Sequence, residues 1–268
     1  MLSIETVYDN NNKWSAYQGI VFKEDGFAEY LSSRVRERFY DIEGTEALIE
    51  EFKDIPSTGF EERLLIDIFS TSPPIDDWKI GEALAECYLE DFEKVKFYYP
   101  SSRDAKNPKA NLQGADLVGF IDVNEEITIF LFGEVKTSGD TNSPPQVMYS
   151  RSGMIDQLRN IKNDPCIRKS LIRWLGFKTK EQRDDDPFKK DYRKALEAYI
   201  KEVAEHKYFL FGILVRDTEP KDTDLKSRYE SLKGDLSDGA QLKLVALYIP
   251  MPIGDMKDYI INEGEGNE

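Results

Sequence analysis

The sequence predicts an α/β fold, in which a mixed central sheet is flanked by helices. Two observations support this prediction. The expected elements follow the order helix, three strands, helices, strand, strand, as in domains where helices cover a sheet. The segment Phe209–Val215 (FLFGILV) is almost continuously apolar, which is typical of a strand buried on both faces.

The individual elements are predicted from the spacing of apolar residues and from turn and capping residues. Asp77 is of a type that caps helix N-termini, and Gly176 is expected to end a helix. Asn124–Glu126 has the length of a hairpin loop between two strands. The expected strands are 96–99, 115–123, 127–136, 208–215 and 242–250; the expected helices are 27–40, 77–95, 154–161, 167–175 and 191–205.

Three segments of unequal charge are expected along the chain. Residues 1–74 are predicted to form an acidic α+β extension that binds a partner, ending at the break Ser72–Pro74. Residues 75–255 are predicted to form the core, and residues 256–268 a flexible acidic tail. The acidity is concentrated at the start, because residues 1–100 hold 22 acidic and 10 basic side chains.

Composition excludes several classes of function. The formal charge of −15 argues at first against a free-standing nucleic-acid-binding protein. There is no apolar run long enough for a membrane span and no signal-peptide pattern, so we expect no membrane partner and a cytoplasmic location. The two cysteines are too few for a disulfide framework or a cysteine-rich zinc site.

The single histidine, His206, narrows the possible chemistry further. It follows a predicted helix, and no G-x-S-x-G, H-E-x-x-H or phosphate-binding glycine motif is present. Interaction of His206 with a helix C-terminus is a better explanation than catalysis. Any chemistry must therefore be carried by carboxylates and lysine, with or without a metal ion.

The strongest local signal lies on the two strands joined by the predicted hairpin. Residues two apart in a strand share a face, so Glu134 and Lys136 point the same way. A three-residue loop at Asn124–Glu126 sets Asp116 directly opposite Glu134. Facing carboxylates are unfavourable unless a cation neutralises them, which favours a Mg²⁺ site. A surface Glu–Lys pair at a strand end is the alternative interpretation.

These residues resemble the PD-(D/E)xK nuclease superfamily, with Ala115 in place of the proline. The resemblance implies a restriction-endonuclease-like core in which Asp116, Glu134 and the Val135 carbonyl bind Mg²⁺ or Mn²⁺ and Lys136 orients the attacking water. It also implies accessory roles for Glu86, on the helix before the motif, and Gln157, on the helix after it. For both, an ordinary position on a helix surface is the alternative. The expected products are a 5′-phosphate and a 3′-hydroxyl.

Three strings, GADLVGF, FGEVKTS and YSRSGMIDQL, resemble the HamA family, the nuclease subunit of the Hachiman anti-phage defence system. This resemblance implies a DNA nuclease that works with a helicase subunit. A catalytically silent scaffold or regulatory subunit with the same fold is the alternative, and an RNA-directed nuclease is a third possibility.

A basic block follows the predicted site. Residues 149–183 hold nine basic and three acidic side chains, and such a block would contact the phosphates of a duplex. A solvated helical face is the alternative interpretation. The residues proposed to contact the DNA backbone are Arg151, Arg159, Lys162, Arg168, Lys169 and Arg173.

Overall fold

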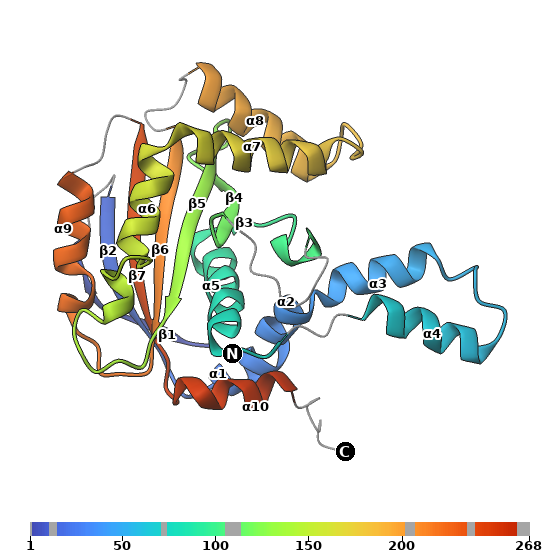
Figure 1. Cartoon of the computed structure of the whole chain (residues 1–268), viewed down its shortest axis with the longest axis horizontal. Helices are drawn as coiled ribbons and strands as arrows, with labels where there is room; N and C mark the ends of the chain where they lie inside the picture. Colours follow the sequence, from blue (N-terminus) through green and yellow to red (C-terminus); the bar gives the residue numbers. More distant parts are fainter. Residues whose placement is uncertain are drawn as a thin grey trace.

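The computed structural model describes residues 2–10, 15–70, 74–104, 114–201, 207–234 and 239–261. Within these ranges, seven strands form one mixed sheet in the order β1-β2-β7-β6-β5-β4-β3 (Figure 1). The predicted α/β fold with a mixed, helix-flanked sheet is confirmed, and it is consistent with a nuclease-like core. The strands are β1 (Ile4–Asp9), β2 (Ser15–Phe22), β3 (Val95–Lys96), β4 (Leu117–Asp122), β5 (Thr128–Thr137), β6 (Tyr208–Arg216) and β7 (Ala240–Tyr248).

Four parallel strands make up the middle of the sheet. β2, β7, β6 and β5 lie side by side in the same direction, while β1 is antiparallel to β2 and β4 to β5. The central strand β6 is buried at all nine of its residues, as its apolar sequence predicted. Such burial requires helices on both faces of the sheet.

One face of the sheet is covered by the N-terminal helices together with α5 (Asp77–Glu93) and α10 (Met256–Ile261). The helix expected over 27–40 is present as α1 (Phe27–Tyr30), a π-helical turn (Leu31–Val35) and α2 (Arg36–Tyr40). Its buried residues Phe27, Leu31 and Val35 recur every four positions, so they form one stripe against the sheet.

The opposite face is covered by α6 (Met154–Asn163), α7 (Pro165–Thr179), α8 (Pro187–Lys201) and α9 (Lys226–Gly234) (Figure 1). Asp164 begins α7, because its side chain accepts the Cys166 N–H at 2.8 Å and Pro165 suits the first helical position. α7 continues through Gly176, so the predicted stop there is wrong. A Cβ at Gly176 would lie 2.5 Å from the Tyr192 hydroxyl oxygen of α8, and the glycine therefore permits close helix packing.

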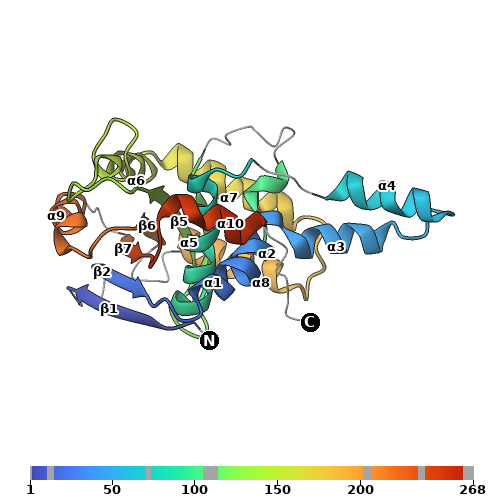
Figure 2. The same ribbon diagram turned by 90° about the horizontal axis from the view of Figure 1, so that it is seen from below.

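A helical hairpin projects from the body of the molecule (Figures 1 and 2). It consists of α3 (Ile42–Glu51) and α4 (Gly59–Phe69), and we call residues 42–69 the arm. Thr58 begins α4 by accepting the Glu61 N–H at 3.3 Å. Arg103 ties the base of the arm to the core through its ion pair with Asp41.

Several N- and C-terminal features differ from expectation. β1 and β2 were not predicted, and they extend the central sheet. Residues 256–261 form the helix α10, with Met256 and Ile260 buried against the core, although they were expected in a flexible tail. Packing of two apolar side chains outweighs the acidic composition there. His206 and residues 262–268 lie outside the described residues, and the three-segment division stays a prediction.

Candidate active site

The β4–β5 hairpin has the predicted register. Leu117 pairs with Gly133 and Asp122 with Thr128, and the Val123 N–H donates to the Ile127 carbonyl at 2.8 Å. The loop is therefore Asn124–Glu126, and the Asn124 side chain stabilises it by accepting two backbone N–H groups. One residue beyond the last pair, the same register sets Asp116 opposite Glu134.

Among the residues that the structure describes, none pairs with the end of β5 on the side of β4, so this end is open there. β4 begins at Leu117, whereas β5 continues beside β6 as far as Thr137. The Val135 N–H has lost its strand neighbour and donates instead to the Asp116 carboxylate at 2.9 Å. This bond holds the Asp116 side chain over the end of β5.

Glu134 and Lys136 lie on the same face at this open end. The Lys136 ammonium is 3.3 Å from the Glu134 carboxylate and 3.9 Å from that of Asp116. Glu134 is only 1% exposed. Burial, together with the nearby charge of Asp116, raises the pKa of Glu134 to about 9, although Lys136 opposes the shift. The three side chains predicted to meet are therefore brought together.

A third carboxylate, which sequence reasoning missed, belongs to the same cluster. Burial and the charges of Asp116 and Glu86 raise the pKa of Glu82 to about 8, and Lys136 lowers it, so the charge of Glu82 is coupled to those of Asp116 and Lys136. Its neighbour Gly81 brings α5 against the end of β5, since a Cβ there would lie 1.9 Å from the Thr137 hydroxyl. A glycine early in an amphipathic helix signals such close approach.

Glu86, the helix acid expected from the resemblance, is placed one turn further along α5. It forms an ion pair with Arg38 at 3.4 Å. Burial raises its pKa to about 7 against the opposing charge of Arg38, and Glu90 adds to the rise. The groups that shift the pKa of Glu86 belong to the π-helical turn, α2, the residue after α2 and α5, and they include neither Asp116 nor Glu134. Its main contact is with the N-terminal helices.

Gln157 lies on α6, which covers the face of the sheet that carries Glu134. Met154 and Leu158 of this helix pack on Gly212, the residue of β6 that pairs with Glu134. The buried side-chain oxygen of Gln157 has no hydrogen-bond partner among the described residues. A buried polar atom without a partner is unusual and marks a place where a ligand or water fits.

The six basic residues expected at DNA separate into two groups. Arg151, Lys169 and Arg173 are exposed. Arg168 is buried, donates to the Ile161 and Lys162 carbonyls at the end of α6, and stacks on Tyr208 at 4.8 Å. Lys162 is also buried, and Arg159 donates to Ser231 at 3.2 Å. Burial therefore removes Arg168 and Lys162 from the surface, and Arg159 is held by Ser231.

The loop after Lys136 is fixed by a buried arginine. Arg216, at the end of β6, donates to the carbonyls of Ser138, Asp140 and Asn142 at 3.2, 2.6 and 3.2 Å. Its charge is balanced by Asp224 at 3.4 Å, and both side chains are almost fully buried. These carbonyls belong to the loop directly after β5. Arg216 therefore fixes the loop that follows the strand of Lys136.

The donor atoms of the cluster suit a hard divalent cation. Asp116, Glu134 and Glu82 supply carboxylate oxygens, the ligands that Mg²⁺ prefers. Their like charges help to raise two of the pKa values, and a cation would relieve that repulsion. Among the described residues, no group of three such side chains is yet arranged around a common point. Asp116 is turned to the Val135 N–H and Glu134 to Lys136.

Comparison with known proteins gives the family. The model of the HamA family matches residues 2–262, nearly the whole chain. The chain belongs to the HamA family. A search of curated proteins found no match. HamA membership makes this a protein associated with Hachiman defence, as the three strings predicted. In the part of the chain that the structure describes, no helix has both the length and the apolar character of a membrane span.

Proposed function

We propose that the protein is a metal-dependent DNA nuclease, the effector subunit of a cytoplasmic anti-phage complex with a helicase. The observation that supports this most is the meeting of Asp116, Glu134 and Lys136 at the open end of β5, with the charge of Glu82 coupled to this cluster. Buried carboxylates with raised pKa values beside a lysine are typical of catalytic sites. The HamA family supplies the defence context.

In this proposal, Asp116, Glu134 and the Val135 carbonyl hold Mg²⁺ or Mn²⁺, and Glu82 takes the accessory role first expected of Glu86. The bound ion would polarise the phosphoryl oxygen and stabilise the negative charge of the transition state. Lys136 then holds the attacking water or the phosphate, because its ammonium already lies within 4 Å of two of these carboxylates. Gln157 is proposed to contact the water or the scissile phosphate with its unpaired oxygen.

Hydrolysis joins the water oxygen to phosphorus and breaks the bond to the 3′ oxygen. A 5′-phosphate and a 3′-hydroxyl result. The exposed cations Arg151, Lys169 and Arg173 are proposed to contact the DNA backbone, which positions a duplex without reading its sequence.

A catalytically silent scaffold is the second candidate. It is favoured by one observation: Asp116 and Glu134 are each paired within the chain, and the described side chains include no preformed three-ligand metal group. Such a protein would bind the helicase and leave DNA intact.

The decisive experiment incubates the protein, alone and with its helicase partner, with closed-circular plasmid, linear duplex and RNA in Mg²⁺. We expect DNA cleavage that is lost with EDTA and in the variants Glu134→Gln and Lys136→Met. Glu126 is an exposed acid of the same hairpin, so Glu126→Gln is the matched control. This variant should cleave DNA like wild type.

Cleavage that survives both Glu134→Gln and Lys136→Met would contradict the site. No cleavage of any substrate by the complex, with the helicase still bound, would favour the scaffold. The melting temperature with and without Mg²⁺ gives an independent measurement of metal binding. An ion held by these carboxylates should raise the melting temperature of wild type but not that of Glu134→Gln.

A further inference from the structure

The arm exposes an apolar stripe to solvent. No residue of α3 or α4 is buried. Phe60, Leu64 and Ile68 follow one another at four-residue spacing on α4 and are 78%, 50% and 65% exposed. Residues at this spacing lie on one side of a helix. An exposed stripe of this kind is typical of a helix that docks into a groove.

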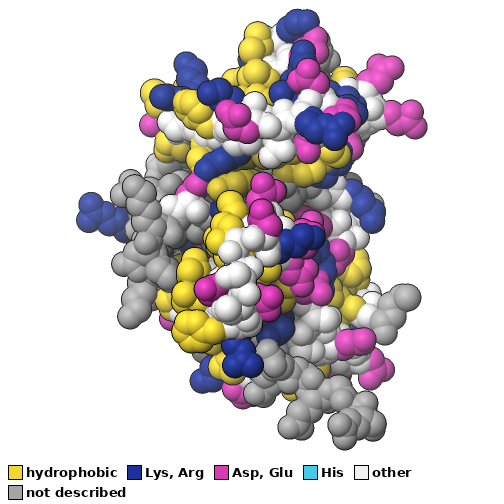
Figure 3. Space-filling view, turned by 90° about the vertical axis from the view of Figure 1, so that its right-hand side faces the viewer, with side chains coloured by type: hydrophobic (Ala, Val, Ile, Leu, Met, Phe, Trp, Pro, Cys, Tyr) yellow, Lys and Arg dark blue, Asp and Glu magenta, His cyan; other side chains and the backbone are white. Residues whose placement is uncertain are grey.

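The charge of the arm restricts what can cover it. Residues 42–69 contain eight acidic and two basic side chains, a net charge of −6. Figure 3 views the molecule from the side to which the arm points, and acidic and hydrophobic side chains lie together in the middle of this face. A nucleic acid would be repelled there. The complementary surface must combine apolar side chains with cations.

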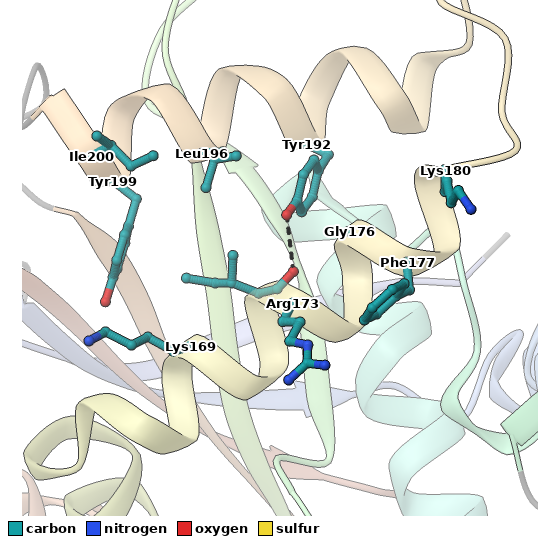
Figure 4. Close-up of a pocket in the computed structure, with 10 residues that line it drawn as sticks. Lys169, Arg173, Gly176, Phe177, Lys180, Tyr192, Leu196, Tyr199 and Ile200 are labelled. Atoms are coloured by element: carbon teal, nitrogen blue, oxygen red, sulfur yellow. Dashed lines mark hydrogen bonds between the residues drawn. The ribbon is translucent and has the colours of Figure 1, made fainter.

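A groove with these properties lies between α7 and α8 of the same chain (Figure 4). Its volume is about 570 Å³, and none of the ten residues that line it is acidic. Lys169, Arg173 and Lys180 supply three cations. Phe177 and Ile200, 62% and 68% exposed, supply apolar surface at its rim.

We propose that the α4 stripe of one copy docks into the α7–α8 groove of a second copy. The arm and the groove of one chain lie apart in Figure 1, so a second molecule must bring them together. This inference goes beyond the nuclease function and does not depend on it.

The size of the contact implies a reciprocal exchange. An 11-residue helix such as α4 is about 16 Å long, and stable interfaces bury about 800 Å² on each partner. One helix in one groove falls short of that area. A twofold axis repeats the contact, because each copy has one arm and one groove. The exchange would cover Lys169 and Arg173, two of the cations proposed for DNA.

The test measures the mass of the full-length protein by light scattering between about 1 and 100 µM, a range suited to moderate affinity. We expect a concentration-dependent dimer in wild type. The double variant Phe60→Asp, Leu64→Asp on the arm and the double variant Phe177→Asp, Ile200→Asp in the groove should each be monomeric. All four positions are exposed, so melting temperatures that match wild type at about 1 µM, where the wild type is mainly monomeric, should show that both variants fold.

Mixing the two monomeric variants distinguishes this exchange from an arm-to-arm contact. The arm variant keeps an intact groove and the groove variant an intact arm, so their mixture should form a mixed dimer through one contact, at least tenfold weaker than wild type. Val123→Asp, an exposed apolar position on the β4–β5 hairpin, is the control and should dimerise like wild type.

Two results would overturn the proposal. One is a wild-type monomer throughout the concentration range. The other is a dimer that the groove variant leaves intact, which would mean that the arm binds elsewhere. If the wild type is monomeric and the arm variant alone loses the helicase, the occupant of the stripe is the helicase and not a second copy.

Discussion

Gly81 of α5 lies so close to Thr137 of β5 that a Cβ at position 81 would be 1.9 Å from the Thr137 hydroxyl oxygen. This contact fixes the distance between the second turn of α5 and the strand that carries Glu134 and Lys136. It therefore also places Glu82 next to the cluster.

The first prediction concerns this contact. Gly81→Ala should lower the free energy of unfolding by about 1–3 kcal/mol, because an added methyl group in a packed contact forces a shift. It should also reduce cleavage, since α5 and Glu82 must move away from β5. Chemical denaturation and plasmid cleavage measure the two effects. Gly59→Ala, with no atom within 4 Å of the added Cβ, is the control and should change neither.

The second prediction compares two acids on one helix. Glu82→Gln should lower the rate of DNA cleavage about 10- to 100-fold, the range typical of residues that support a metal site. Glu86→Gln should cleave within about threefold of wild type and should not lower stability at pH 8, because burial already disfavours the charged form of Glu86 despite its ion pair with Arg38. Equal loss of cleavage in both variants would contradict the assignment of Glu82.

The third prediction concerns pH. The folded-state pKa of Glu134, about 9, lies above its ordinary value of 4.5. Its contribution to stability is therefore complete below pH 4.5 and is lost as the pH rises towards 9. Without divalent cations, Glu134→Gln should be more stable than wild type at pH 8, by on the order of 1–3 kcal/mol, and nearly equal to it at pH 4.5. Urea midpoints at several pH values measure this, and a difference independent of pH would count against it.

The fourth prediction separates two arginines of α7. Arg173 is exposed, so Arg173→Ala should weaken DNA binding and reduce the slope of log affinity against log salt by about 1. Arg168 is buried on the last carbonyls of α6, so Arg168→Ala should leave the slope unchanged and cost about 2–4 kcal/mol of stability. Salt titrations of duplex binding measure the slope for each variant. An equal fall of the slope in Arg173→Ala and Arg168→Ala would contradict the prediction.

The sequence was most informative where one local rule acts. Loop length and strand periodicity were enough to set Asp116 opposite Glu134, because a hairpin register depends on adjacent residues. The strand β6 was equally predictable, since an apolar run can only be buried.

Prediction failed where a tertiary contact decides the outcome. Glu82 and Glu86 are four residues apart on one side of the same helix, so periodicity cannot tell which of them lies near Asp116. The contact of Gly81 with Thr137 decides this in favour of Glu82. Likewise, the positive charge of Arg168 gave no sign that the side chain is buried at the end of α6. The place of β2 in the central sheet was missed because its parallel partner, β7, is more than two hundred residues away in the chain, although β1 pairs with it locally.

The short start of β4 has a consequence for solubility. Within the described part of the chain, the last residues of β5 form a strand edge, and an unpaired edge invites another chain to add a strand. The Asp116 carboxylate accepts the hydrogen bond of the Val135 N–H at this edge and brings a negative charge to it. The carboxylate proposed to bind the metal therefore also protects the molecule from intermolecular strand pairing, and Asp116→Ala should aggregate sooner than Asp116→Asn, which keeps an oxygen acceptor.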